Sequence, residues 1–134
     1  MDEHLQDYVT LTSCTPADSI YNSQIMKLSN IKVQIGISDI ASYKSTGEFR
    51  CEKAGLYLVS ATIISSTVSS KVSIRKNDAI ITNSYISLKD GYYENAPLFV
   101  TMALQVGDVI SIHADNNVNG VMATGSCWTI AKIR

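Results

Sequence analysis

Two histidines, at positions 4 and 113, are the side chains of this chain that are best suited to move a proton near neutral pH. His113 has Asp108 and Asp115 on either side of it and serines are frequent, so a Ser-His-Asp triad can be assembled formally. No Gly-x-Ser-x-Gly motif supports such a triad, no Cys-x-x-Cys pair accompanies the histidines, and no glycine-rich phosphate loop is present. The sequence therefore predicts a protein that is not an enzyme, in which His113 is a hydrogen-bonded residue of the surface or the core.

Two polar segments, 89–97 and 115–120, carry the residues that are best suited to bind a ligand. Loops carried on a rigid scaffold often hold binding sites, and tyrosine together with asparagine is typical of surfaces that bind sugars and proteins. Asparagine is also common in turns because it tolerates their backbone angles, so a plain turn is the competing interpretation. The candidate ligand-binding residues are Tyr92, Tyr93, Asp115, Asn116, Asn117 and Asn119.

The charged residues point away from several classes of partner. The 134-residue chain has 11 basic and 12 acidic residues, a net charge of −1, and no basic cluster. Nucleic acids and anionic membrane surfaces bind to basic stripes, so neither partner is expected. No apolar run is long enough to span a membrane, and the acidic N-terminus does not resemble a signal peptide. Composition alone leaves a cytosolic protein and a mature secreted domain as alternatives.

Apolar residues recur at alternate positions along most of the chain, which is the period of β-strands. In residues 56–64 one face is wholly apolar and the other is mostly so, which predicts a central strand that is covered on both sides. Strands are expected at 8–14, 31–37, 49–51, 56–64, 71–75, 79–88, 98–104, 109–114 and 126–133, with polar loops at 38–47, 89–97 and 115–120. This series predicts an all-β, antiparallel sandwich or jelly roll that forms a single domain over residues 1–134.

Four segments, in order along the chain, resemble the globular domain of the C1q family. They are Thr46–Cys51 with Gly55–Leu58, then Ile74–Asn77, Leu104–Val109 and Ser126–Ile130. The first is similar to the TG-x-F-x-C/A-x-x-x-G-x-Y-x-F signature, although Leu58 stands where Phe is usual, and the third is similar to the L-x-x-GD-x-V motif. The resemblance implies a ten-stranded antiparallel jelly roll shared with tumour necrosis factor-like ligands. It also implies secretion and a tight homotrimer.

Trimer assembly also agrees with the apolar character of the expected central strand. Each sheet of a lone sandwich has one buried face, so a second apolar face needs a cover. In the family that cover is a three-fold interface, without which a monomer would expose an apolar patch. The residues expected at this interface are Tyr57, Val59, Trp128 and Ile130.

The resemblance further implies a covalent link and a metal site. The first and last strands of the family lie side by side, so Cys14 would face Cys127 in a disulfide, and buried thiols are the alternative. Some relatives bind calcium in the loop that corresponds to 89–95, where Asp90 and Glu94 are the acidic residues. An ordinary solvated loop is the alternative to calcium at these two positions.

The resemblance implies a secreted, non-catalytic module of innate immunity that binds microbial surface glycans or lipopolysaccharide. The alternative is a signalling or matrix-organising ligand that binds a protein receptor, as tumour necrosis factor-like or cerebellin-like heads do. Calcium-dependent sugar binding would distinguish the first function, and tight binding to a cell-surface protein would distinguish the second.

Overall fold

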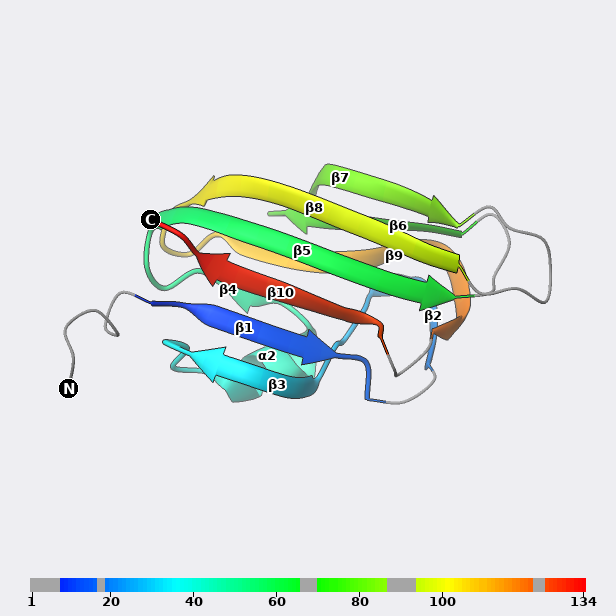
Figure 1. Ribbon diagram of the computed structural model, residues 1–134, viewed down its shortest axis with the longest axis horizontal. Helices are drawn as coiled ribbons and strands as arrows, with labels where there is room; N and C mark the ends of the chain where they lie inside the picture. Colours follow the sequence, from blue (N-terminus) through cyan, green and yellow to red (C-terminus); the bar gives the residue numbers. More distant parts are fainter. Residues whose placement is uncertain (1–7, 17–18, 66–69, 87–93, 122–124) are drawn as a thin grey trace.

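Two antiparallel sheets lie face to face in the computed structural model, which describes residues 8–16, 19–65, 70–86, 94–121 and 125–134 (Figure 1). Sheet A has the strand order β3 (Asn30–Ile35), β1 (Thr10–Cys14), β10 (Cys127–Lys132), β5 (Gly55–Ser65) and β8 (Glu94–Leu104). Sheet B has the order β2 (Ser19–Ile25), β9 (Val109–Val121), β6 (Ser70–Lys76) and β7 (Ala79–Ile86), and β4 (Phe49–Arg50) also pairs with β9. This arrangement confirms the predicted all-β jelly roll.

Strand β5 lies between β10 and β8 in sheet A, and its alternation sets much of the core of the molecule. Tyr57, Val59, Ala61 and Ile63 point toward sheet B and are at most 3% exposed. The residues between them point away from sheet B and are half-buried or, for Leu56, 36% exposed. The sandwich covers the inner face of this strand and leaves the outer face open within one chain, so cover of the outer face by another copy stays a prediction.

The residues predicted for a three-fold interface belong to the core of a single chain. Tyr57, Val59 and Ile130 have no exposed surface, and Trp128 is 2% exposed. All four side chains lie between the two sheets, so a second copy of the chain cannot contact them. Their assignment to an interface is corrected: an apolar, aromatic strand residue signals burial, but it does not reveal which partner covers it.

Two segments that were predicted as loops have regular structure. Residues 38–47 contain the helix α2 (Ile40–Thr46), where the side chain of Asp39 accepts a hydrogen bond from the Ser42 amide and Gly47, at φ +79°, ends the helix. Residues 115–120 continue β9 and pair with β2, for example through Asn117 opposite Asn22. Strand β8 likewise begins at Glu94, inside the loop predicted at 89–97.

A buried tyrosine joins α2 to β1, to β10 and to the segment before β3. The Tyr43 hydroxyl accepts a hydrogen bond from Trp128 Nε1 at 2.6 Å, contacts Ser13 Oγ at 2.6 Å, and donates to the Leu28 carbonyl at 3.2 Å. The Tyr43 and Trp128 rings also stack, with centroids 6.4 Å apart. Burial raises the pKa of Tyr43, which keeps the phenol protonated and able to donate.

We expect Tyr43→Phe to lower the free energy of unfolding by about 2–3 kcal/mol, because it leaves the buried Trp128 N–H and the Leu28 carbonyl without their partner. Urea denaturation followed by Trp128 fluorescence measures the loss. Tyr8→Phe, which removes the hydroxyl of a tyrosine that is 50% exposed, is the matched control and should leave stability unchanged. Equal stability of the two variants would contradict the proposed role of the Tyr43 hydroxyl.

A disulfide joins β1 to β10 at the end of their ladder. Cys14 and Cys127 are register partners and are bonded to each other, which is the pairing that the resemblance implies. Cys51 is a free, buried thiol. The bond spans a sequence separation of 113 residues, so it closes nearly the whole described chain into one loop.

The double substitution Cys14→Ser and Cys127→Ser should lower the free energy of unfolding by about 2–5 kcal/mol, since it releases a long loop in the unfolded chain. Thermal unfolding of the variant and of the parent under non-reducing conditions provides the comparison. A reducing agent should destabilise the parent and leave the double variant unaffected. If the parent also shows no response to the reducing agent, the bond contributes nothing to stability.

Candidate functional site

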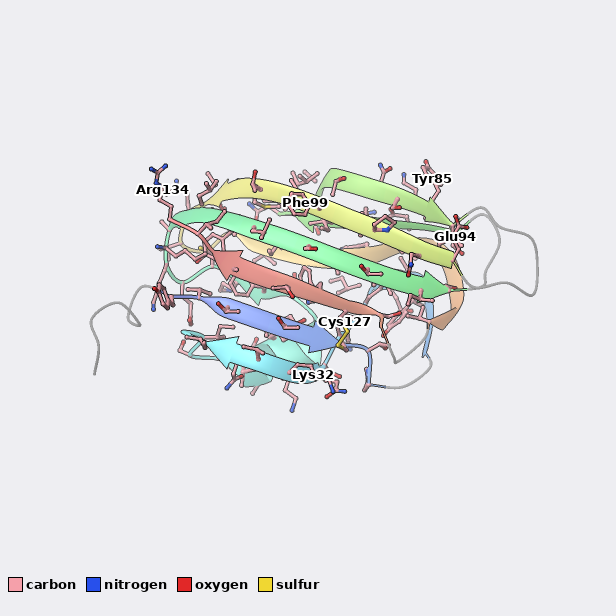
Figure 2. All side chains as sticks on the ribbon, viewed as in Figure 1. Lys32, Tyr85, Glu94, Phe99, Cys127 and Arg134 are labelled. Carbon is pink, nitrogen blue, oxygen red and sulfur yellow. A yellow bond between two sulfur atoms is a disulfide. The ribbon has the colours of Figure 1, made fainter. Side chains whose placement is uncertain are left out.

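The outer face of sheet A is uncharged across all five strands. Residues that pair across the sheet share a face, and those that alternate with the buried positions of β5 point outward. Phe99 is 67% exposed on this face, and Val33 and Ile35 are 43% and 41% exposed (Figure 2). Two rows that cross the sheet, without a charged side chain, are Ile35–Thr10–Ala131–Leu58–Thr101 and Val33–Thr12–Thr129–Ser60–Phe99.

The outer face of sheet B has the opposite character. Lys71, Ser73 and Arg75 alternate with the fully buried Val72 and Ile74 on β6, so their side chains point outward. On the neighbouring β9, the outward positions between the buried Ile110, Ile112 and Ala114 are those of Ser111, His113 and Asp115. This face therefore carries basic and acidic groups as well as hydroxyl groups, whereas the outer face of sheet A carries hydroxyl groups but no charge.

The charged side chains of this face are paired with one another and lie along the sheet. Arg75 forms an ion pair with Asp115 at 2.5 Å, and Ser73 Oγ donates to the same carboxylate oxygen at 3.0 Å. Ser73 points outward and yet has no exposed surface, since Arg75 Nε also lies 3.4 Å from its hydroxyl oxygen. The side chains of Arg75 and Asp115 are 25% and 9% exposed. The network is a preformed, partly desolvated polar surface.

Two atoms of this surface lack hydrogen-bond partners among the described residues, namely His113 Nε2 and Asp115 Oδ2, and both are buried. His113 is expected to be hydrogen-bonded, and its Nε2 has no partner among the described residues. Burial lowers the pKa of His113 and the Arg75 guanidinium lowers it further, whereas Asp115, Asp78 and Glu48 oppose the shift. The imidazole is therefore neutral at pH 7.

Ser73, His113 and Asp115 come close together, but they do not make a catalytic triad. Ser73 pairs with His113 across β6 and β9. The Ser73 hydroxyl donates to Asp115, however, and the buried hydroxyl has no access to a substrate. In a triad the histidine takes the serine proton and the aspartate orients the histidine, which is a different set of hydrogen bonds.

The predicted ligand-binding residues divide into those that the structure describes and those that it does not. Asp115 belongs to the polar network, and the exposed Asn116 next to it accepts a hydrogen bond from the Lys71 amide at 2.8 Å. Asn117 and Asn119 lie in β9, with side chains outside the described residues. Tyr92 and Tyr93 lie outside the described residues altogether. Sequence reasoning missed Lys71, Ser73 and Arg75, although their alternation with Val72 and Ile74 places them outward.

The described residues do not supply a calcium site within one chain. Glu94 is half-buried at the start of β8, opposite Ser65, and Asp90 lies outside the described residues. No group of three or more metal-binding side chains occurs among the residues that are described. Calcium needs six to eight oxygen ligands, so one carboxylate does not suffice, and calcium stays a prediction.

Comparison with known proteins places the chain in a family. The C1q domain family matches residues 23–130, which is most of the sequence. The chain belongs to the C1q domain family. No curated protein matches it.

Solved structures of this C1q domain's fold come from both C1q and tumour necrosis factor proteins. Murine APRIL at pH 5.0 has a TM-score of 0.73 at 12% identity over 94% of this chain and 99% of its own. Eiger TNF from S. frugiperda has a TM-score of 0.72 at 10% identity over 96% and 94% of the two chains. The globular domain of zebrafish complement 1qA has a TM-score of 0.68 at 11% identity over 92% and 93%. At these identities the likeness shows the fold alone. In the described part of the chain, no helix has the length and apolar character needed to cross a bilayer.

The lowered pKa of His113 predicts an acid-dependent loss of stability. Its folded-state pKa lies below the ordinary 6.5, so the unfolded chain binds the proton more readily. The contribution of His113 is complete above pH 6.5 and is lost as the pH falls toward the folded-state pKa. We expect the urea concentration at the midpoint of unfolding to decrease in the parent as the pH is lowered below 6.5. The decrease should be smaller in His113→Asn. Parallel pH profiles of the two proteins would contradict this assignment.

Proposed function

We propose that this C1q domain is a secreted, non-catalytic recognition module that assembles as a homotrimer and binds extracellular ligands such as microbial surface glycans or lipopolysaccharide in innate immunity. The observation that carries the proposal is the contrast between the two outer faces: sheet A is uncharged and sheet B presents a network of polar groups. An uncharged, partly apolar face suits contact with another copy, and a polar face suits recognition of a hydrophilic ligand.

The outer face of sheet A replaces the core residues as the proposed surface of the trimer. Ser60 and Leu58 lie on this face in β5, between β10 and β8, and the exposed Phe99 lies beside Ser60 on β8. Closed assemblies hide such faces from water, and obligate interfaces are depleted in charge. The buried Tyr57, Val59, Trp128 and Ile130 support this surface from beneath, because they hold the strands whose outer residues form it.

Placing a lysine on this face tests the assembly. Ser60→Lys should convert a trimer into a monomer, since the charge would be buried without a partner in the assembled form. Molar mass from light scattering, with and without a chelator, measures the oligomeric state and any dependence on calcium. Asn83→Lys adds the same charge on the exposed side of β7 in sheet B and should leave the mass unchanged. A parent protein that is monomeric at working concentrations would contradict the trimer.

The ligand class is tested by presenting the trimer to an array of microbial glycans and lipopolysaccharides. Binding to the array supports glycan recognition. The second candidate, a ligand for a protein receptor, is favoured by the exposed apolar side chains of Ile80, Ile81 and Tyr85 on β7. Silence on the array together with tight binding to a cell-surface protein would replace the first function by the second. Absence of both would contradict a recognition role.

A further inference from the structure

Three side chains form a row across β7, β6 and β9 on the outer face of sheet B. Tyr85 on β7 is the register partner of Lys71 on β6. Val72, which follows Lys71, pairs with Ala114 on β9, which precedes Asp115, so Lys71 and Asp115 lie on neighbouring strands at adjacent positions. Val72 and Ala114 face the core with no exposed surface, so Lys71 and Asp115 point outward. Neighbouring strands lie about 4.8 Å apart, so the row is about 10 Å long.

The members of this row differ in what they offer a ligand. Tyr85 is 60% exposed, and Figure 2 shows it projecting at the edge of the molecule. Lys71 Nζ lies 5.8 Å from the centroid of the Tyr85 ring. At the other end, the Asp115 side chain is more than nine-tenths buried, and its Oδ2 has no hydrogen-bond partner among the described residues. The other oxygen, Oδ1, is held by Arg75 and Ser73.

The chemistry of the row selects among possible ligands. A carboxylate oxygen only accepts hydrogen bonds, so Asp115 Oδ2 needs a donor, and its negative charge disfavours a phosphate or carboxylate ligand. Arg75 is already paired with Asp115, so it does not offer a free anion site. The exposed tyrosine ring favours an apolar or cationic surface. A pyranose ring has both required features, an apolar C–H face and hydroxyl groups that donate.

We propose that the row Tyr85–Lys71–Asp115 is a saccharide site, in which the C–H face of a pyranose packs on the Tyr85 ring and a hydroxyl group donates to Asp115 Oδ2. Lys71 Nζ donates to a second hydroxyl oxygen. In the free protein Lys71 Nζ lies over the Tyr85 ring and Oδ2 is closed to solvent, so side chains of this surface must move as the sugar enters. Arg75 and Ser73 keep the carboxylate in place through Oδ1. The site rests on the proposed recognition function, and it specifies both the ligand class and the surface.

Titration of the ¹⁵N-labelled protein with methyl α-D-mannopyranoside, methyl β-D-glucopyranoside and N-acetylglucosamine, followed by NMR, tests the site. We expect shifts at Tyr85, Lys71 and Asp115, and no shifts with glycerol, which has hydroxyl groups but no ring face. Tyr85→Ala and Asp115→Asn should each raise the dissociation constant by about tenfold or more. Asparagine keeps an oxygen for Arg75 and Ser73, and unchanged melting temperatures show that each variant is folded.

Two matched controls accompany these variants. Tyr85→Phe keeps the ring, and Ile81→Ala removes an exposed apolar side chain from the same strand; both should stay within about twofold of the parent. Shifts confined to another surface, or equal affinity of Asp115→Asn and the parent, would overturn the site while leaving glycan recognition intact. If the sugars do not bind but a cell-surface protein does, the saccharide site fails and the receptor-binding alternative stands. If the protein binds neither the sugars nor a cell-surface protein, the proposed recognition function is wrong as well.

Discussion

A sandwich of two sheets can bury only one face of each sheet, and this constraint decides how every strand of the molecule is used. Tyr57, Ile63 and Trp128 fill the space between the sheets and have at most 2% of their surface exposed. Their neighbours in sequence must therefore point outward, whatever their chemistry. The functional character of the domain is carried by those neighbours, which are uncharged on sheet A and polar on sheet B.

Long-range links hold the strands of sheet A in register and join them to α2. The Tyr43 hydroxyl binds Trp128, Ser13 and the Leu28 carbonyl, so α2, β1, β10 and the segment before β3 share one buried hydrogen-bond network. The Cys14–Cys127 disulfide holds the same end of the β1–β10 ladder, one register pair beyond Ser13 and Trp128. Because β10 also pairs with β5, these links fix the rows of side chains on the outer face of sheet A. The rows on sheet B depend in the same way on the pairing of β6 with β9.

Sequence patterns predict the fold well because alternation is a local property. The period of two correctly predicts strands at 56–64 and 71–75, which are β5 and β6 in the structure. It does not reveal what covers a face, so Trp128 was assigned to an interface when the opposing sheet already covers it. The Asn-rich segment after Asp115 has the composition of a turn, but its pairing with β2 makes it part of β9. Long-range pairing outweighs local composition there.

The polar network also was beyond local sequence reasoning, because its members are far apart in the chain. Ser73 and Arg75 meet Asp115 across a sequence distance of 42 and 40 residues, and only the register of β6 with β9 brings them together. Once they meet, Arg75 neutralises Asp115 and shields Ser73, and the carboxylate keeps one oxygen without a partner. Such an oxygen is energetically unfavourable in a free protein, and in the proposed site a ligand hydroxyl satisfies it. The proposed assembly through sheet A would leave this face open, so self-association and recognition would use opposite sides of the same sandwich.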